Sequence, residues 1–304
     1  MSGPRREPVV FRSDYGLPYS KGLMAQSIMA TGLPPTRSFE LARAVEGRLS
    51  NLDQAEVALD DLRQVAEDVL GAEEGQAVVT RFRQWWTLRR LDRPLVVLLG
   101  GVTGVGKSTV ATQLATRLGI TRVIATDQIR QVVRAFFSRE FMPAVHYSSF
   151  DASLALDEPP PGSAGAVAGF LQQAHDIAPG IDALVERAVS ERSQIVIEGV
   201  HVLPHIPSPR LRERAVTVHA LLAVGDQNAH RERFEARASQ APRPAARYLE
   251  AFDRLRTLQD HLVQQASQSG IPVIDELRTD SALNRVVEVV LDSVGSAQPA
   301  GTPR

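Results

Sequence analysis

The sequence predicts a three-layer α/β domain built on a mostly parallel sheet, preceded by a small and mainly helical region. In the second part of the chain, short apolar runs alternate with helix-length segments, as they do when helices cover both faces of a parallel sheet. Residues 38–90 instead carry apolar side chains at helical spacing without such alternation. Asp92-Arg93-Pro94 separates the two patterns. We therefore expect a helical region at 1–92, the α/β domain at 93–294 and a disordered tail at 295–304.

The composition argues against several functional classes. The 304 residues include 34 Lys and Arg against 35 Asp and Glu, so no overall field attracts nucleic acid or an anionic membrane. Aromatic residues make up only 5%, which further disfavours a nucleic-acid surface. The chain has no cysteine, which excludes disulfides, thiolate metal sites and a cysteine nucleophile. With no signal peptide or membrane span in the N-terminal sequence, we expect a cytoplasmic protein without nucleic-acid or membrane partners.

The N-terminal region is defined by apolar residues that recur every three or four positions. They are Leu41, Val45 and Leu49, followed by Leu59, Leu62, Val65 and Val69. This spacing predicts amphipathic helices. The chain has only two lysines, Lys21 and Lys107, and otherwise uses arginine. Each lysine therefore marks a candidate site for a compact ammonium group, although chance remains an alternative for Lys21.

The α/β domain begins with the continuous apolar run 95–99, which predicts a strand buried on both faces. Further strands are expected near 122–125 and at 194–197, 215–224 and 271–274. Helices are expected at 107–118, 127–139, 181–190, 229–238, 245–267 and 281–293. The proline-rich stretch 157–163 predicts a loop.

The segment 101–108 matches the pattern G-x-x-x-x-G-K-[ST] between the first strand and a predicted helix. In such a loop, backbone N–H groups surround phosphate oxygens and the lysine bridges the β- and γ-phosphates. The pattern predicts a P-loop NTPase fold that binds ATP and Mg²⁺, whereas a glycine-rich turn with an incidental lysine is the alternative. The expected ATP-binding residues are Gly101, Thr103, Gly104, Val105, Gly106, Lys107, Ser108 and Thr109.

Glu198 ends the apolar run 194–197, at the place where a carboxylate that holds Mg²⁺ is expected. We predict Ser108 and Glu198 as the metal-binding residues. Aspartate is the usual residue at this place, so a role of Glu198 in base catalysis stays open. A glutamate that caps the following turn is the alternative without function.

Asp127 follows the second predicted strand, at the edge of the sheet where such folds bind ligands. It could accept the proton of an acceptor hydroxyl. Arg130 and Arg134 follow at i+3 and i+7, so both could meet an anionic acceptor. Alternatively, Asp127 is the N-cap of a helix and the arginines form a solvated face.

An arginine-rich segment at 230–237, followed by Arg243 and Arg247, lies where a lid should close over the transferring phosphoryl group. We predict Arg233, Arg237 and Arg247 as its catalytic arginines, acting with Lys107 and Asp127. A charged surface helix is the alternative. The histidines show no metal-ligand spacing, so no zinc site is expected.

Taken together, these residues resemble the 2-phosphoglycerate kinase family, from about Val9 to Val263. The resemblance is carried by the segments 17–23, 98–109, 125–130, 146–150, 197–201 and 247–252. It implies a nucleoside-kinase-like P-loop fold and the phosphorylation of the 3-hydroxyl of 2-phosphoglycerate by ATP, giving 2,3-bisphosphoglycerate. It also implies His146, Ser148 and Ser149 as acceptor-binding residues, although the serines could only cap a turn and His146 could pack in a core.

The same resemblance implies that residues 1–92 form a shortened ATP-cone-like region, in which Lys21 would touch a regulatory nucleotide. A helical dimerisation or packing domain explains the same spacing, and homo-oligomerisation stays open. Two other functions also stay open. One is a kinase of the same fold that acts on a sugar acid or a nucleoside. The other is an ATP-responsive regulator that transfers nothing.

Overall fold

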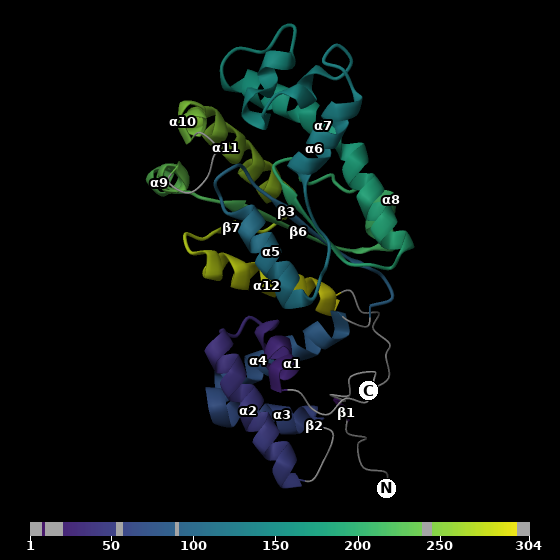
Figure 1. Ribbon diagram of the computed structural model, residues 1–304, viewed down its shortest axis with the longest axis vertical. Helices are drawn as coiled ribbons and strands as arrows, with labels where there is room; N and C mark the ends of the chain where they lie inside the picture. The colour runs from purple at the N-terminus through teal and green to yellow at the C-terminus, as the bar shows by residue number, and fades with distance from the viewer. Residues whose placement is uncertain (1–7, 10–20, 53–56, 89–90, 239–244, 297–304) are drawn as a thin grey trace. The chain divides into compact units, whose positions relative to one another are not determined.

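The computed structural model of the protein describes residues 8–9, 21–52, 57–88, 91–238 and 245–296 (Figure 1). Its contacts divide the chain into two compact units. One unit contains residues 1–90 with 294–304, and the other contains residues 91–293. Each unit has its own buried core.

The smaller unit is mainly helical, as predicted. Its helices are α1 (Lys21–Met29), α2 (Pro35–Leu52), α3 (Leu59–Leu70) and α4 (Ala72–Leu88). Leu41, Val45 and Leu62, which the helical spacing singled out, are all buried. A short antiparallel pair of strands, β1 (Pro8–Val9) and β2 (Val57–Ala58), was not predicted.

Lys21 is the first residue of α1, and its Nζ lies 3.3 Å from Glu46 Oε2. Both side chains are partly exposed, so this pair contributes little to stability. Residues 18–20 of the motif around Lys21 lie outside the described residues. Contact of Lys21 with a nucleotide therefore stays a prediction.

The larger unit contains a five-stranded sheet in the order β4-β5-β3-β6-β7. The strands are β3 (Leu95–Gly100), β4 (Val123–Ala125), β5 (Ile195–Gly199), β6 (Val216–Ala223) and β7 (Val273–Asp275). Every described pair of these strands is parallel. The central strand β3 is buried along its whole length, which explains its uninterrupted apolar sequence.

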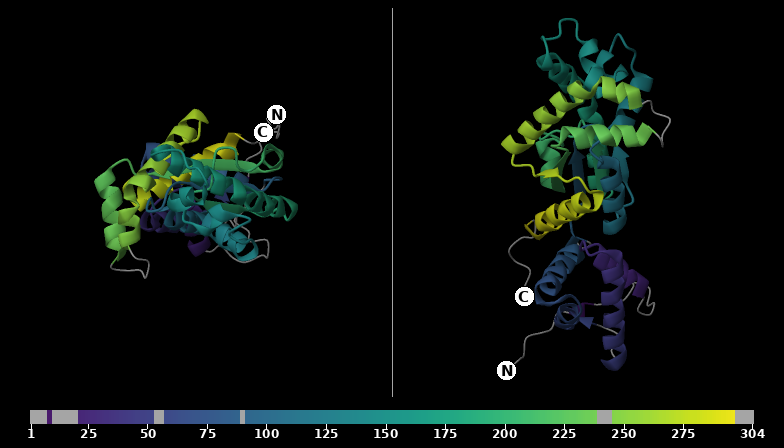
Figure 2. Two further views of the ribbon diagram at one scale, coloured as in Figure 1. Left: turned by 90° about the horizontal axis from the view of Figure 1, so that it is seen from above. Right: turned by 90° about the vertical axis from the view of Figure 1, so that its left-hand side faces the viewer.

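Helices cover both faces of this sheet (Figures 1 and 2). On one side lie α5 (Lys107–Leu118) and α12 (Thr279–Ser296), which Arg117 joins by donating from Nη1 to Asn284 Oδ1 at 2.8 Å. On the other lie α7 (Ser163–Ser190), α8 (Pro209–Arg214) and α11 (Phe252–Gln268). This three-layer arrangement, with a glycine-rich loop between β3 and α5, is the predicted P-loop NTPase fold.

Shorter elements surround the carboxyl edge of the sheet. They are α6 (Thr126–Phe136), the 3-10 helices η1 (Pro143–His146) and η2 (Ser149–Ala155), α9 (Gln227–Ala238) and α10 (Ala245–Glu250). Among the described residues, no helix is long and apolar enough to cross a membrane.

Several predicted boundaries were wrong. α7 begins eighteen positions before the expected residue 181. Phe170, Ala174 and Ile177 form a buried stripe along its first half, and the helix continues through Pro179. The helix expected at 245–267 is two helices, separated at Ala251. α6 ends at Phe136 rather than 139. α12 continues to Ser296, so the expected tail at 295–296 was wrong, and 297–304 lie outside the described residues.

Candidate active site

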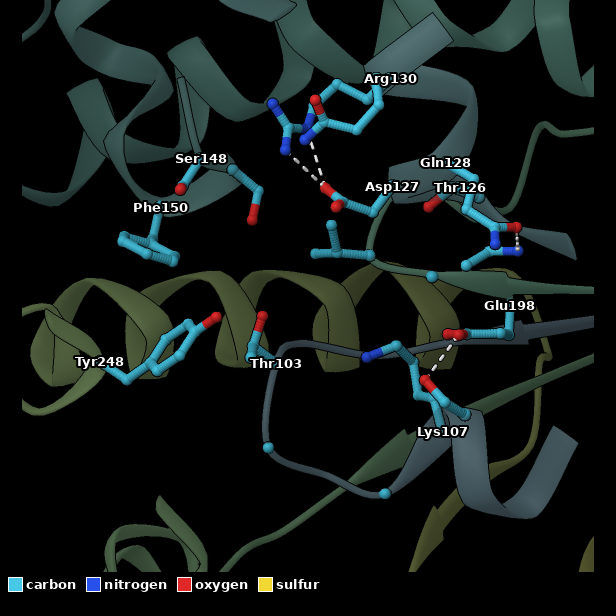
Figure 3. Close-up of a pocket in the computed structure, with 18 of the residues that line it drawn as sticks. Thr103, Lys107, Thr126, Asp127, Gln128, Arg130, Ser148, Phe150, Glu198 and Tyr248 are labelled. Atoms are coloured by element: carbon cyan, nitrogen blue, oxygen red, sulfur yellow. Dashed lines mark hydrogen bonds and ion pairs between the residues drawn. The ribbon is translucent and has the colours of Figure 1, made fainter. Parts of the chain in front are cut away.

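A cavity of about 520 Å³ lies at the carboxyl edge of the sheet (Figure 3). We call it the cleft. It is lined by residues 103, 104 and 106–108 of the glycine-rich loop, by 125–128, 130 and 131 at the start of α6, and by 198–200 at the end of β5. Residues 148–150 and 247–248 complete the lining. Parallel strands bring these segments together because their carboxyl ends meet at one edge of the sheet.

The glycine-rich loop has the backbone that an anion-binding loop requires. Gly104 and Gly106 have φ values of 95° and 94°, which residues with a side chain rarely adopt. A Cβ atom on Gly106 would meet no atom within 4 Å, so the loop leaves space there. Gly106 is also the N-cap of α5, whose first N–H groups attract negative charge. The loop therefore fits nucleotide phosphates.

Lys107 is the first residue of α5 and lines the cleft. Its Nζ donates to Val102 O at 2.7 Å, which holds the ammonium group against the loop. The loop therefore combines backbone N–H groups with a nearby ammonium group, which suits it to bind an anion.

Ser108 and Glu198 come from two segments ninety residues apart. Ser108 Oγ donates to Glu198 Oε1 at 2.6 Å, and Glu198 is 5% exposed. One hydroxyl and one carboxylate at hydrogen-bond distance are a suitable oxygen donor set for Mg²⁺, which keeps several of its own waters in proteins. The residues present therefore fit the predicted metal.

Asp127 and Arg130 form an ion pair at the opposite wall of the cleft. Asp127 Oδ1 accepts from Arg130 Nε at 2.9 Å and lies 2.8 Å from its Nη2. Arg130 Nη1 also donates to Val145 O at 2.9 Å and to Tyr147 O at 3.0 Å, so the guanidinium is held in one orientation. Asp127 is not the N-cap of α6, since Ala125 occupies that position.

The structure separates the predicted acceptor-binding residues into two groups. Ser148 and Ser149 line the cleft with Asp127 and Arg130. His146 is not among the described residues that line it, because its ring Nε2 lies 3.0 Å from Phe137 O instead. Arg134, one turn further along α6, is exposed and is likewise absent from the described lining. The acceptor-binding roles of His146 and Arg134 therefore stay predictions.

The predicted lid arginines lie in different places. Arg247 lines the cleft, and its Nη2 lies 3.0 Å from Asp151 Oδ2. Arg233 instead lies against the glycine-rich loop, where its Nη1 donates to Val105 O at 3.0 Å and its Nη2 to Leu277 O at 2.7 Å. It is not among the described residues that line the cleft, and its predicted action on the phosphoryl group stays a prediction. The side chain of Arg237 lies outside the described residues.

Other parts of the predicted loop contribute backbone rather than side chains. Val105 is 4% exposed and faces the interior, as does the buried Gly101. Thr109 is exposed in the first turn of α5 and, like these two, is absent from the described lining. Thr103, Gly104, Gly106, Lys107 and Ser108 line the cleft as expected.

Sequence reasoning missed two aromatic residues of the cleft, Phe150 and Tyr248. Their ring centroids lie 5.9 Å apart in an edge-to-face arrangement. Tyr248 also stacks on Phe234 of α9 at 5.3 Å. Tyr248 is the neighbour of Arg247 in a segment already singled out, and this position was the signal that could have identified it.

Comparison with curated proteins identifies close relatives along almost the whole chain. The 2-phosphoglycerate kinase of Methanopyrus kandleri is 32% identical over 95% of this chain and 88% of its own length. Those of Methanothermobacter thermautotrophicus and Pyrococcus horikoshii are 33% and 34% identical, over 90% of this chain and 90% of each relative.

Two solved structures align with about two-thirds of the chain. A gluconokinase from Sinorhizobium meliloti aligns with a TM-score of 0.38 and 19% identity, over 67% of this chain and 93% of that one. A shikimate kinase from Acinetobacter baumannii, in complex with shikimate, aligns with a TM-score of 0.37 and 14% identity, over 69% and 97%. No protein-family model matches the chain. Because relatives at 30% identity or more cover nine-tenths of it, the chain belongs to the 2-phosphoglycerate kinase family and is an ATP-dependent phosphotransferase.

Proposed function

We propose that this enzyme transfers the γ-phosphoryl group of ATP to the 3-hydroxyl of 2-phosphoglycerate and releases 2,3-bisphosphoglycerate and ADP. The observation that carries the proposal is one cleft with two different walls. Lys107, Ser108 and Glu198 form a wall suited to a nucleotide phosphate chain, and Asp127 and Arg130 form a wall suited to an acceptor that is both anionic and hydroxylated.

On the nucleotide wall, the N–H groups of the glycine-rich loop and the ammonium group of Lys107 would bind the β- and γ-phosphates. Ser108 and Glu198 would hold Mg²⁺, which supplies neutralisation of phosphate charge when bound. These groups orient the terminal phosphorus toward the space between the two walls.

On the acceptor wall, 2-phosphoglycerate would present a phosphate and a carboxylate. Arg247 and the Ser148 and Ser149 hydroxyls line this side of the cleft with Arg130, and all of them can donate hydrogen bonds to such groups. Asp127 would accept the proton of the 3-hydroxyl while the oxygen of that hydroxyl forms a bond to the γ-phosphorus. The bond from that phosphorus to the β–γ bridging oxygen breaks, and ADP leaves with the electron pair.

An acceptor screen tests this proposal. Purified protein is incubated with ATP and Mg²⁺ and a panel that contains 2-phosphoglycerate, 3-phosphoglycerate, glycerate, gluconate and a nucleoside, and ADP release is measured. We expect turnover with 2-phosphoglycerate and a new phosphomonoester at its C3 oxygen by phosphorus NMR. Faster turnover with gluconate or the nucleoside would favour a different acceptor, and ATP binding without ADP release on any acceptor would favour a regulator.

A further inference from the structure

A buried chain of polar side chains lies behind the acceptor wall and is not used in the mechanism above. Thr126 Oγ1 lies 2.9 Å from His201 Nδ1, and His201 Nε2 lies 2.9 Å from Gln173 Oε1. Gln173 Nε2 in turn donates to Ala144 O at 2.6 Å and to Tyr147 O at 3.1 Å. Thr126, His201 and Gln173 are each at most 1% exposed.

The direction of each hydrogen bond follows from the Gln173 amide. Its nitrogen donates to two carbonyl groups, so its oxygen must accept from His201 Nε2–H. Complete burial lowers the pKa of His201 to about 3, so the ring is neutral and Nδ1 carries no proton. Nδ1 therefore accepts from the Thr126 hydroxyl. Each polar atom of this buried chain thus has a defined partner.

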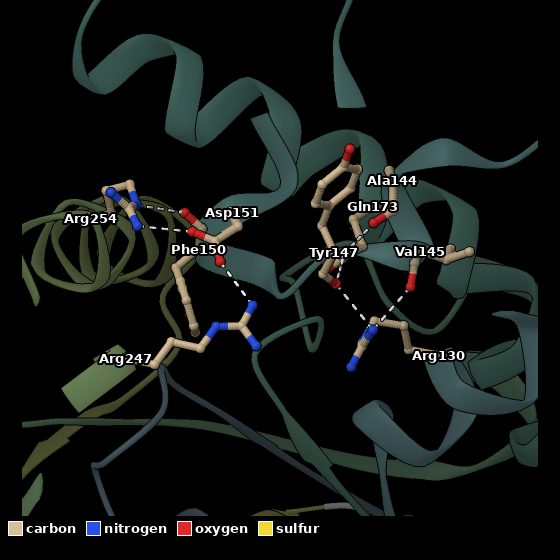
Figure 4. Close-up of polar contacts among 9 residues, drawn as sticks. All are labelled: Arg130, Ala144, Val145, Tyr147, Phe150, Asp151, Gln173, Arg247 and Arg254. Atoms are coloured by element: carbon tan, nitrogen blue, oxygen red, sulfur yellow. Dashed lines mark hydrogen bonds and ion pairs between the residues drawn. The ribbon is translucent and has the colours of Figure 1, made fainter. Parts of the chain in front are cut away.

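The buried chain meets the acceptor wall at two places. Tyr147 O accepts from both Gln173 and Arg130, so these two side chains hold residues 144–147 between them (Figure 4). At the other end, Thr126 immediately precedes Asp127, and His201 follows Glu198 by three residues. Gly199 packs so closely on Thr126 that a Cβ atom added to Gly199 would overlap the threonine hydroxyl.

We propose that His201 and Gln173 are positioning residues for phosphoryl transfer. They fix the start of α6 and residues 144–147 relative to the end of β5, so that Asp127 and Arg130 face Glu198 across the cleft at a constant separation. The proposal rests on the proposed function only where it assigns Asp127 and Arg130 to the acceptor. Small displacements of reacting groups cost large factors in rate, roughly 100-fold for 1 Å.

Two variants and a matched control test the proposal. His201→Phe keeps a ring but loses both hydrogen bonds, and Gln173→Met keeps the approximate length of the side chain. We expect kcat to fall about 10- to 100-fold in each, with KM for ATP within about twofold of wild type, because neither residue lines the described part of the cleft. Because both act through one chain of hydrogen bonds, the double variant should be little slower than either single variant.

His219→Phe is the control. His219 is partly buried, which lowers its pKa to about 4, but it lines a different cavity beside α11. We expect it to lower the thermal stability to a similar extent while kcat stays within about twofold of wild type. A kcat of His201→Phe as high as that of the control would overturn the proposal.

A second measurement does not depend on the acceptor. Amide hydrogen exchange should become faster in His201→Phe at residues 126–130 and 144–147, where the Tyr147 amide donates to Ala144 O at 3.2 Å, and should stay unchanged there in the control. If the wild-type protein does not phosphorylate 2-phosphoglycerate, the proposed function fails. Amide hydrogen exchange can still test the positioning role of His201 in that case. Unchanged exchange at both segments would refute the positioning role even in an active enzyme.

Discussion

At the scale of single residues, Lys107 is the side chain on which nucleotide binding depends most directly. Its ammonium group already lies against the loop that we expect to bind phosphate. Lys107→Ala should lower kcat by about 100-fold or more, because it removes the positive charge that we propose stabilises the transferring phosphoryl group. The measurement is steady-state ADP release. Thermal unfolding is the control, and it should change little because the side chain is only partly buried.

Asp127 is the candidate for the group that accepts the proton. Asp127→Asn keeps an oxygen that Arg130 can bind, so the wall should keep its shape, but the amide is a poor proton acceptor. We expect kcat to fall by roughly 100- to 10,000-fold while the Kd for ATP stays within about twofold. Calorimetric titration with ATP and initial-rate kinetics separate the two effects. A rate equal to wild type would remove Asp127 from the mechanism.

At the scale of elements, α10 and η2 are joined through one carboxylate. Asp151, whose side chain is 15% exposed, pairs with Arg247 at 3.0 Å and with Arg254 of α11 at 2.9 Å (Figure 4). Arg247 lines the cleft, and Arg254 is not among the described residues that do. The two arginines therefore offer a matched comparison, because Arg247 can contact a ligand in the cleft and Arg254 cannot.

Arg247→Ala should raise KM for the acceptor about tenfold or more, because it removes a charged donor from the acceptor wall. Arg254→Ala is the control, since it breaks the other ion pair of Asp151 without removing an arginine from the lining of the cleft. Both constants come from initial rates at saturating ATP. Equal effects of the two substitutions would indicate that Arg247 acts only by holding Asp151.

The glycine-rich loop and α9 are packed too closely for any side chain on Gly104. A Cβ atom there would lie 2.6 Å from Phe234 Cζ and 2.7 Å from His230 Nε2, in addition to the strain at φ 95°. Gly104→Ala should therefore move the loop and weaken ATP binding by about tenfold or more. Gly119→Ala, at a φ of 71° with open space around it, should cost only about 1 kcal/mol of stability and leave ATP binding unchanged. Titration with ATP compares the two.

The elements show which features local sequence predicts. α5 was predicted at its observed bounds, because the loop, the lysine and the apolar stripe all lie within a few residues of one another. The first half of α7 was missed, since its alanine- and glycine-rich sequence with Pro179 gives a weak periodic signal. Strand ends brought Lys107, Glu198, Asp127 and Arg130 into one cleft as expected. The buried partners of His201 lie 75 and 28 residues away, and nothing in local sequence marks such pairs.

At the scale of the whole molecule, the two compact units offer a test of where nucleotide binds. ATP at about 100 times its Kd should stabilise the unit that contains the cleft by about 2.7 kcal/mol, which corresponds to an increase in Tm of roughly 5 to 10 °C for a unit of this size. Residues 1–90 have their own core, so differential scanning calorimetry should resolve their unfolding as a separate transition.

Lys107→Ala turns this measurement into a test of the ATP-cone-like region. Because this variant should bind ATP weakly at the cleft, ATP should no longer raise the Tm of the larger unit, since the stabilisation depends on binding to the native state. If the smaller unit binds a regulatory nucleotide near Lys21, its own transition will still shift in this variant, and Lys21→Ala should abolish that shift. If ATP leaves the Tm of the smaller unit unchanged in both proteins, a packing or dimerisation role is favoured instead. If ATP does not raise the Tm of the larger unit in the wild-type protein, ATP binding at the cleft is contradicted.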